Sequence, residues 1–325
     1  MKILITGGTG FQGSNLSRSL LKDGYDVVIL NTHSQKNETN VQRFDLSGAY
    51  MIWGTINDMK TVKDAMFDVD LVIHTAAKIH VDDSIKNPTD YFETNVMGTN
   101  NVLEAARRFN KPVIHVSTCE VYGYQDADLT EDSPLMPRSP YAASKAGADR
   151  MAYSYYTTYD MNICIVRPFN VFGPGQKDGE TGAVIPIWTT ELQKGKNINI
   201  YGDGSQSREF IYIDDLISAY RILIDKMLFG NELAGEVINI GTGIDVTIKD
   251  LAEKMVEKVM CLDKSEIIYS KNRPGEVKRF ISNSDKMKSL GWTPKISIDE
   301  GLDKYVDWRK EIDDLDFYRN VMIGM

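Results

Sequence analysis

The sequence predicts an α/β fold: a doubly wound parallel sheet followed by a smaller C-terminal domain. Two observations carry this prediction. In the first half of the chain, short apolar runs rich in β-branched residues alternate with segments of helical period, which is typical of parallel strands covered by helices on both faces. Beyond about residue 172 the alternation loosens, and loops containing glycine and proline separate shorter elements.

Each strand of the first half is expected where a continuous apolar run is bounded by turn residues. The expected strands are KILIT (2–6), YDVVIL (25–30), DLVIHTAA (70–77), PVIHVS (112–117) and NICIVRP (162–168). Amphipathic stretches such as NLSRSLLKDG (15–24) and TNNVLEAARRFN (99–110) lie between them. We expect these stretches to form the covering helices, because parallel strands need long crossover connections.

The domain boundary is not expected to be a single cut. We expect the first domain to span residues 1–171. The late apolar run EVINIG (236–241) has the pattern of a buried strand, so this domain is expected to recruit about residues 205–250 as well. The rest of 172–325 would then form a smaller, discontinuous domain that supplies the substrate site.

The composition limits the kinds of partner. The formal net charge is −9 and the pI is about 5.1, whereas nucleic acids and anionic membranes require a basic surface. Three cysteines without a close pair predict no disulfide framework, and four histidines outside metal-ligand spacing predict no metal site. The chain opens on a strand, without a charged leader or a long apolar stretch, so we expect a cytoplasmic protein.

A glycine-rich turn follows the first expected strand. In ITGGTGFQGSNL (5–16), Gly8, Gly10 and Gly13 fit the G-x-G-x-x-G spacing, and Gly7 gives a second register. Glycine permits a tight turn and a close approach of the backbone to a pyrophosphate, which the first amides of the next helix can hold. Such a turn can be a plain connector. Between an apolar strand and an amphipathic helix it favours dinucleotide binding, and therefore a Rossmann-like first domain.

The end of the second strand bears on which dinucleotide is bound. VVILNTHS (27–34) offers Asn31 where NAD-binding proteins usually carry an acidic residue for the adenosine ribose. An asparagine can still hydrogen-bond a ribose hydroxyl, and it does not repel a 2′-phosphate. His33, Ser34 and Lys36 could meet such a phosphate, although exposed loops often carry these residues anyway. We therefore expect NAD and leave NADP open.

A tyrosine and a lysine are spaced for catalysis. SPYAASKAGADRMAYSYY (139–156) has a proline at its start and continues in a helical pattern, so Tyr141 and Lys145 share one helical face. A lysine ammonium beside a phenol lowers the phenol pKa and makes the tyrosine a usable base near neutral pH. Taken alone, such a pair is usually a helix-start aromatic and a solvated lysine. Together with the glycine turn and Thr118, it favours a catalytic role.

These residues match a known family. The chain resembles the extended short-chain dehydrogenase/reductases, the nucleotide-sugar epimerase/dehydratase group, over nearly its whole length. The matching segments are TGGTGFQG (6–13), HTAA (74–77), TNVMGTNNVLEA (94–105), VSTCEVYG (116–123), YAASK (141–145), RPFNVFGPG (167–175), YGDGSQSREFIYIDDL (201–216), VINIGTG (237–243) and RPGEVKRFISNSDKMKSLGWTPK (273–295). The resemblance implies an NAD-dependent enzyme, a nucleotide-diphospho-sugar substrate and a homodimer.

The resemblance also assigns residues by position. It implies that the catalytic residues are Thr118, Glu120, Tyr141 and Lys145. It implies substrate contacts at Thr118, Asn170, Arg208 and Arg273, and arginines suit a diphosphate because a guanidinium binds phosphate oxygens bidentately. The implied cofactor-binding residues are Gly7, Gly10, Phe11, Gln12, Gly13, Asn31, Thr55, Ile56, Ala76, Ala77, Lys78, Asn95, Tyr141, Lys145 and Pro168. Thr55 and Ile56 stand where the family usually has an Asp-Ile pair near adenine.

Glu120 bears on which reaction follows. The shared first step would be oxidation at sugar C4, with Tyr141 taking the hydroxyl proton and Thr118 hydrogen-bonding the same oxygen. A ketone at C4 acidifies the neighbouring C–H at C5, so a positioned carboxylate can eliminate water across C5 and C6. In the resembling 4,6-dehydratases a glutamate sits two residues after the threonine, as Glu120 does here. We therefore expect an NDP-sugar 4,6-dehydratase.

Three other functions stay open. Some dehydratases place an aspartic acid before the glutamate to protonate the departing hydroxyl, whereas this chain has Cys119. A 4-epimerase of the UDP-glucose or UDP-N-acetylglucosamine type needs no such acid, and NDP-sugar decarboxylases keep the same glutamate. A non-catalytic regulator that senses a dinucleotide would be expected to lose the Tyr141 and Lys145 pair, which is present.

Overall fold

The structure is a computed structural model that describes residues 1–323 apart from 126, 178, 180–181, 260–264 and 272–277. Its largest unit is a seven-stranded parallel sheet with the order β11-β6-β5-β4-β1-β2-β3. The strands are β1 (Lys2–Thr6), β2 (Asp26–Asn31), β3 (Tyr50–Trp53), β4 (Leu71–His74), β5 (Val113–Val116), β6 (Ile163–Pro168) and β11 (Val237–Ile240). The strand order reverses between β1 and β4, which is where doubly wound sheets bind ligands.

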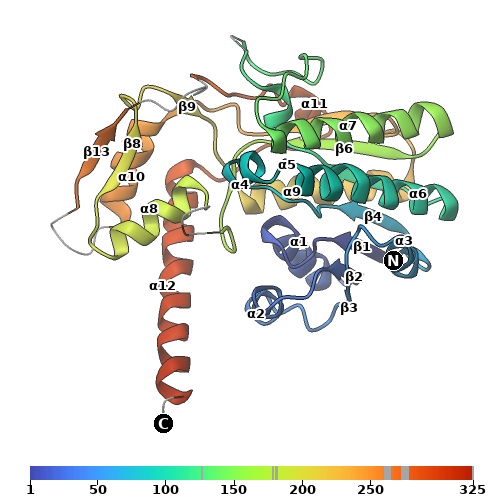
Figure 1. Cartoon of the computed structure of the whole chain (residues 1–325), viewed down its shortest axis with the longest axis horizontal. Helices are drawn as coiled ribbons and strands as arrows, with labels where there is room; N and C mark the ends of the chain where they lie inside the picture. The colour runs from blue at the N-terminus through green and yellow to red at the C-terminus, as the bar shows by residue number, and fades with distance from the viewer. Residues whose placement is uncertain (126, 178, 180–181, 260–264, 272–277, 324–325) are drawn as a thin grey trace.

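Helices cover both faces of this sheet because both faces are apolar. In β1, Ile3 and Ile5 join one buried core with Leu16, whereas Leu4 joins a second core with Val62, since successive strand side chains point to opposite faces. The first core is covered by α1 (Phe11–Lys22) and α9 (Ile213–Phe229), and the second by α3 (Met59–Met66), α6 (Thr99–Phe109) and α7 (Pro140–Tyr159), as Figure 1 shows. Helix α2 (Gln35–Arg43) connects β2 to β3.

Short helices follow two of the strands. After β4 come α4 (Val81–Lys86), α5 (Pro88–Phe92) and a π-helical turn (Glu93–Gly98), and after β5 comes a 3₁₀ turn (Cys119–Tyr122). Helix α7 begins where the sequence predicted it. Ser139 accepts a hydrogen bond from the amide of Ala142, and Pro140 occupies the first helical position, so the helix start is capped in the way its residues favour.

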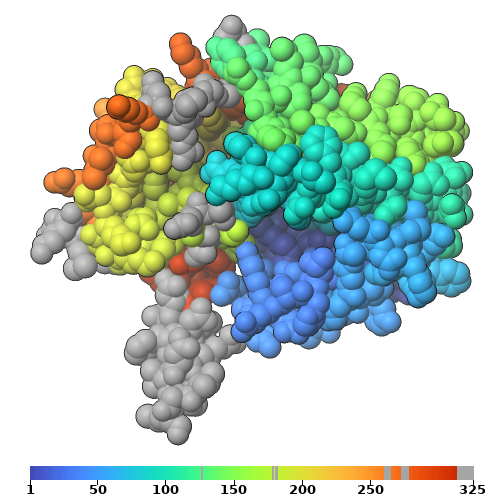
Figure 2. All heavy atoms as spheres, in the orientation of Figure 1, coloured from blue at the N-terminus to red at the C-terminus, as the bar shows by residue number. Residues whose placement is uncertain are grey.

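A second lobe lies beside the sheet lobe, as Figure 2 shows in yellow and orange against blue and green. In it, α8 (Val184–Gln193) and α10 (Ile248–Val259) pack on the parallel pair β8 (Ile198–Tyr201) and β13 (Ile267–Ser270). The remaining elements of the chain are β7 (Val171–Phe172) paired with β10 (Ile211–Tyr212), β9 (Ser207–Arg208) paired with β12 (Val246–Thr247), and α12 (Ile298–Ile323). Helix α11 (Asp285–Ser289) packs on β11 of the large sheet.

The fold class predicted from the sequence is confirmed: an α/β, Rossmann-like parallel sheet with helices on both faces. The late run at 236–241 contains β11, which pairs with β6 in the large sheet. The domain boundaries themselves, 1–171 with about 205–250 and a discontinuous remainder, stay a prediction. In the described part of the chain, no helix is long and apolar enough to cross a bilayer.

Candidate active site

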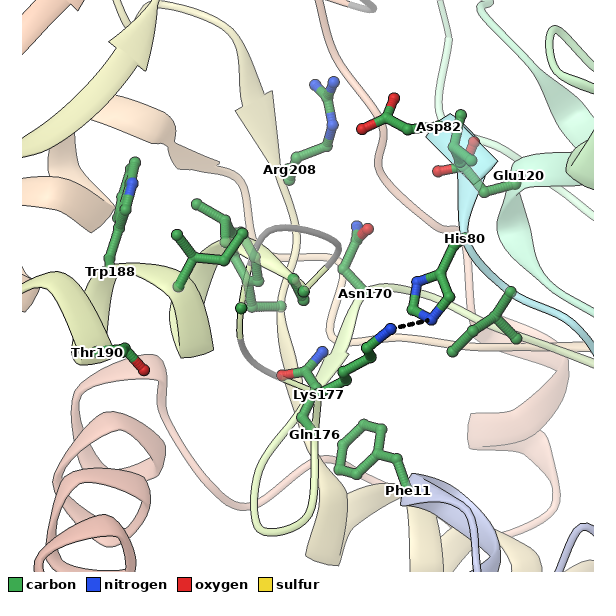
Figure 3. A pocket seen from close by; sticks show the side chains of 18 of the residues that line it. Phe11, His80, Asp82, Glu120, Asn170, Gln176, Lys177, Trp188, Thr190 and Arg208 are labelled. Atoms are coloured by element: carbon green, nitrogen blue, oxygen red, sulfur yellow. Dashed lines mark hydrogen bonds between the residues drawn. The ribbon is translucent and has the colours of Figure 1, made fainter. Parts of the chain in front are cut away.

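A cleft of about 1680 Å³ opens between the two lobes. The sheet lobe contributes the loops that follow parallel strands, which bring Phe11, His80 and Glu120 to the cleft wall. The second lobe contributes Trp188 and Arg208 from α8 and β9. Figure 3 shows Arg208 and Glu120 toward one end of the cleft and Phe11 toward the other. The cleft therefore lies where the strand order predicts a ligand.

The glycine turn is packed so closely that it excludes side chains. Gly7 has a φ of 74°, and a Cβ there would lie 2.8 Å from the Cα of Ala76. A Cβ on Gly13 would lie 2.2 Å from the carbonyl oxygen of Gly7. The amide of Gly10 donates to that same carbonyl at 2.9 Å, which closes the turn. The glycines are therefore required by the backbone path that leads into α1.

The turn fits a dinucleotide pyrophosphate in its polar groups as well. Helix α1 begins at Phe11, and its N-cap residue Gly10 has no side chain to cap it, so the first amides of the helix are not used by a capping side chain. Thr9 lines the cleft, and its buried hydroxyl has no hydrogen-bond partner in the described residues. Amides at a helix N-terminus together with such a hydroxyl are the donors that phosphate oxygens need.

The other residues expected near the cofactor mostly have partners within the protein. Asn31 sits beside the turn, where its Oδ1 accepts a 3.3 Å hydrogen bond from the amide of Thr9. Gln12 accepts a hydrogen bond from the hydroxyl of Tyr220. The side chain of Ile56 is buried in the second core, and Pro168 is buried at the end of β6, so only backbone groups of these two residues could meet a ligand. The hydroxyl of Thr55 accepts from the amide of Asn57.

The loop after β4 is held by Asn95. The amide of Lys78 donates to Asn95 Oδ1 at 2.8 Å, and Asn95 Nδ2 donates to the Lys78 carbonyl and to Ser144 Oγ, both at 2.9 Å. Asn95 is therefore a support that ties this loop to α7. The Lys78 ammonium pairs with Asp90 at 2.8 Å, which directs it to the protein surface. Ala76, just after the end of β4, lies against Gly7 of the glycine turn, and Ala77 follows it in the chain.

Tyr141 and Thr118 meet at the ends of α7 and β5. Tyr141 is buried near the N-terminus of α7, and its phenol hydrogen-bonds the Thr118 side chain. Thr118 also accepts from the amide of Glu120 at 3.3 Å, which caps the 3₁₀ turn. The 3₁₀ turn and the helix start therefore bring these two hydroxyls together.

One expectation about this pair is wrong for the structure. We expected Lys145 to lower the pKa of Tyr141, but burial raises that pKa above its ordinary value, and the hydrogen bond with Thr118 only partly opposes the rise. The Lys145 ammonium instead donates to the carbonyl of Val116 at 2.6 Å. Burial also lowers the pKa of Lys145 to about 8. The four-residue spacing predicted a shared face correctly, but burial decides the acidity of both groups.

Glu120 offers a carboxylate to the cleft. Its side chain is exposed on the cleft wall, yet enough protein surrounds it that desolvation raises its pKa, while the positive charge of Arg208 opposes that rise. A glutamate with a raised pKa in a cleft suits proton transfer. Its neighbour Cys119 is buried, and desolvation raises the pKa of its thiol well above 9. That thiol is a poor proton donor.

Two of the three residues expected to grip the diphosphate line the cleft. Asn170 follows β6 and donates from Nδ2 to the Glu209 carbonyl at 2.9 Å. Arg208 projects from β9 and donates to the carbonyl of Ser207 at 2.8 Å. Arg273 lies outside the described residues. The guanidinium of Arg208 and the amide of Asn170 therefore both line the cleft.

Comparison with known proteins identifies the family. A family model described as GDP-mannose 4,6 dehydratase matches residues 4–305. The chain belongs to this family. The low-salt glycan biosynthesis protein Agl12 of Haloferax volcanii is 37% identical over 313 residues, which are 95% of this chain and 98% of that protein.

Solved structures of dehydratases and epimerases share the family fold. A dTDP-glucose 4,6-dehydratase from Streptomyces venezuelae, solved with NAD, has a TM-score of 0.86 and 34% identity, covering 96% of this chain and 97% of that one. A UDP-glucose 4-epimerase from Thermotoga maritima, solved with UDP-glucose, has a TM-score of 0.88 and 29% identity, covering 96% and 99%. The predicted family, the extended short-chain dehydrogenase/reductases that include NAD-dependent sugar epimerases and dehydratases, is confirmed.

The GDP-mannose 4,6 dehydratase family motifs did not reveal every cleft residue. Lys177 Nζ lies 3.1 Å from His80 Nε2, so the two lobes touch across the cleft, as the dashed line in Figure 3 shows. Asp82 and Arg138 also line the cleft. His80 and Asp82 stand in HVDD (80–83), in the segment that follows the expected strand 70–77, and this position is the signal that could have identified them. Lys177 and Arg138 lie in loops, where the sequence has no periodic pattern of apolar residues that could have identified them.

Proposed function

We propose that this protein is an NAD-dependent nucleotide-diphospho-sugar 4,6-dehydratase. The observation that carries the proposal is Glu120: a cleft-facing carboxyl with a raised pKa, two residues beyond a threonine that hydrogen-bonds the Tyr141 phenol. A 4,6-dehydratase needs an acid–base group for the sugar hydroxyl and a separate base for C5. The 3₁₀ turn after β5 supplies the carboxyl of Glu120, and the first turn of α7 supplies the phenol of Tyr141.

The first step is oxidation of the sugar at C4. Bound NAD would supply the acceptor for the hydride of C4 and the donor for the later reduction, which would make the overall reaction redox-neutral. Tyr141 removes the proton of the C4 hydroxyl, and Thr118 hydrogen-bonds the same oxygen. Lys145 holds the nicotinamide ribose. Arg208 on β9 and Asn170 after β6 bind the diphosphate, because the side chains of both residues line the cleft.

The second step is elimination of water. Glu120 takes the proton from C5, whose acidity comes from the C4 ketone, and the C6–O bond breaks as the C5–C6 double bond forms. The proton that leaves C5 ends on the departing oxygen, so Glu120 is a carboxylate again and one water is released. The alkene then takes up a hydride at C6, which balances the hydride removed from C4, and a proton at C5, which balances the proton that Tyr141 removed from the C4 hydroxyl. Cys119 contributes no proton because its buried thiol has a raised pKa. A single carboxyl with a raised pKa can both accept and return this proton.

NAD is the dinucleotide that the site supports. The solved structures that resemble this chain include dehydratases and an epimerase solved with NAD. Two of the three residues that could have met a 2′-phosphate have other partners: His33 Nε2 lies 2.7 Å from a carboxylate oxygen of Glu38, and Ser34 caps α2. The third, Lys36, lines the cleft. Glu38 places negative charge beside this loop, which disfavours the extra phosphate of NADP.

Gly13→Ala is expected to weaken NAD binding by about tenfold or more. The new Cβ would lie 2.2 Å from the Gly7 carbonyl oxygen and 2.8 Å from the Gly8 Cα, and overpacking against backbone costs about 1–3 kcal/mol. Calorimetric titration with NAD checks this. Gly147→Ala is the matched control, because its Cβ would meet only Val96, at 3.5 Å, on an exposed helix face. Equal affinity in the two variants would contradict the assigned NAD site.

The proposal is tested by product analysis. The purified protein is incubated with a panel of uridine, thymidine, guanosine and cytidine diphosphosugars, with and without added NAD or NADP, and product mass and sugar NMR spectra are recorded. Loss of one water with a 4-keto-6-deoxy signature supports the dehydratase. Loss of carbon dioxide from a uronic acid would instead indicate an NDP-sugar decarboxylase. If no sugar were turned over, the non-catalytic regulator that senses a dinucleotide would be the remaining interpretation.

A 4-epimerase is the second candidate. The buried thiol of Cys119 supports it, because no acid precedes Glu120 to assist the departure of the C6 hydroxyl. The epimerase requires only Thr118, Tyr141 and Lys145, and the sugar must turn within the cleft between two hydride transfers. An unchanged product mass with inversion at C4 would overturn the dehydratase in favour of this function.

We also propose a homodimer built on α6 and α7 and a cytoplasmic location. Tyr153 and Tyr159 on α7 are 39% and 49% exposed, and Met97 just before α6 is 58% exposed, so apolar surface gathers on this pair of helices. The free thiols of Cys119 and Cys164 are compatible with a reducing compartment. Light scattering should give about twice the chain mass of 36.6 kDa, and a mass of one chain would overturn the dimer.

A further inference from the structure

A buried ion pair lies one helical turn beyond Lys145. Asp149 is completely buried on the inward face of α7, four residues after Lys145. Its two carboxylate oxygens accept hydrogen bonds from Arg167 Nε and Nη2 of β6, both at 2.9 Å. Arg167 is itself only 1% exposed, and its Nη1 donates to the hydroxyl of Tyr122 at 2.8 Å. The Asp149 carboxylate is therefore fixed in position by a bidentate contact.

Asp149 is the anion that acts on Lys145. His74 on β4 and His115 on β5 are buried, and both burial and the charge of Lys145 lower their pKa values, so both are neutral at ordinary pH. The other ionisable groups around Asp149 are Arg167 and Tyr122 beneath it and Arg150 at its edge. Within the part of the chain described by the structure, the charge that opposes the desolvation of Lys145 is that of Asp149.

We propose that Asp149 is a positioning residue for the reaction at Tyr141: its carboxylate, held by Arg167, keeps the buried Lys145 ammonium protonated beside the Val116 carbonyl. This inference rests on the proposed function of Tyr141 and Lys145. Burial penalises a charged lysine, and only a fixed opposite charge can offset the penalty where water is excluded. The ammonium donates to the Val116 carbonyl at 2.6 Å and keeps two further N–H groups for a ribose hydroxyl, whereas a neutral amine has one donor fewer and no charge to strengthen these hydrogen bonds.

The sign of the effect follows from the lysine equilibrium. The pKa of Lys145 lies at about 8 with Asp149 in place, so the ammonium is lost as the pH rises through that value. Removing the Asp149 charge lowers this pKa further, by about one unit for a charge one helical turn away in a partly screened interior. The alkaline limb of the pH profile of kcat/KM should therefore move to lower pH.

Asp149→Asn is the direct test. We expect the alkaline limb to move down by about one pH unit, with activity largely kept at pH values below it. Because Asp149→Asn leaves the buried Arg167 without its carboxylate partner, the double variant D149N/R167Q is made as well; it buries two neutral amides and should show the same downward shift. Arg150→Gln is the matched control, because it removes the half-exposed partner of the same carboxylate. In this variant the alkaline limb of the pH profile of kcat/KM should stay at the wild-type pH.

A second readout does not depend on turnover. NMR of protein labelled at the lysine side chains gives the Lys145 pKa directly, with the signal assigned by its loss in Lys145→Met. A pKa lowered by about one unit in D149N or in the double variant supports the proposal. An unchanged pKa in both folded variants overturns it, and so does an activity loss that is equal at every pH. A lowered pKa with an unmoved activity limb would instead overturn the role given to Lys145 in the proposed function.

Discussion

Glu120→Gln is expected to abolish water loss from the sugar, lowering its rate by at least about a hundredfold, the usual contribution of a positioned general base. Glutamine keeps the size and cleft position of the side chain but cannot accept the C5 proton. Oxidation at C4 does not use this carboxyl, so the variant should still reduce its cofactor when substrate is added. Mass spectrometry of the product and absorbance of the reduced nicotinamide measure the two steps separately.

The same carboxyl sets the acid limb of the wild-type profile. Desolvation raises the pKa of Glu120 above the ordinary 4.5, and the base form is present only above the raised value. Dehydration by the wild-type protein should therefore fall as the pH drops through a midpoint higher than that of an ordinary glutamate. Arg208 opposes the rise, so Arg208→Gln should move that midpoint further up.

Tyr141→Phe is the informative comparison. It removes the phenol that hydrogen-bonds Thr118, so both the reduced cofactor and the dehydrated product should disappear. Glu253→Gln is the matched control for the carboxyl-to-amide change, because Glu253 is an exposed residue of α10. If Glu120→Gln still released water at the rate of this control, Glu120 would not be the base, and the 4-epimerase would become the better interpretation.

The sheet lobe could be predicted because its signals are local. Apolar runs of strand length predict β1, β2, β4, β5 and β6. Ile3 and Leu4 lie on opposite faces of the sheet because successive side chains of a strand point in opposite directions. The glycine turn and the Tyr141 and Lys145 spacing are local as well. Each of these features is encoded within a few neighbouring residues, so the sequence carries it without knowledge of the tertiary structure.

The rest of the site depends on contacts between distant segments. His80 and Lys177 are 97 residues apart and meet only because the second lobe folds back over the sheet. The prediction that the pKa of Tyr141 is lowered was wrong for the same reason. The four-residue spacing brings Lys145 to the same helical face, but burial of the phenol by other elements raises its pKa. Sequence period determines which face a side chain occupies, whereas its solvation depends on what packs there.

Glu209 is expected to make the stability of the fold depend on pH. It is completely buried beside Arg208, and one of its carboxylate oxygens accepts from the amide and hydroxyl of Ser282 and from the amide of Gly243, at 2.9–3.0 Å. The other oxygen has no hydrogen-bond partner in the described residues and faces Gly241, where a Cβ would come within 1.8 Å of it. Burial raises the pKa of this carboxyl from 4.5 to about 7.

The direction of the pH dependence follows from proton linkage. Between pH 4.5 and about 7 the folded protein keeps a proton on Glu209 that the unfolded chain has released. The stability gained from this proton is complete below 4.5 and is lost as the pH rises through about 7, which amounts to about 3 kcal/mol. Glu209→Gln has no proton to lose. Its free energy of unfolding, relative to wild type, should therefore rise by about 3 kcal/mol from pH 4.5 to pH 8.

Comparing the two proteins isolates Glu209 from the other buried titrations. His74 and His115 have lowered pKa values, so they make both proteins more stable as the pH rises, and their effect cancels in the difference. Urea unfolding of wild type and Glu209→Gln at several pH values gives that difference directly. A difference that stays constant from pH 4.5 to pH 8 would mean that Glu209 is already ionised in the fold. The oxygen of Glu209 that has no partner in the described residues would then need a hydrogen-bond donor. The neighbouring Arg208 is the first residue to test for that role.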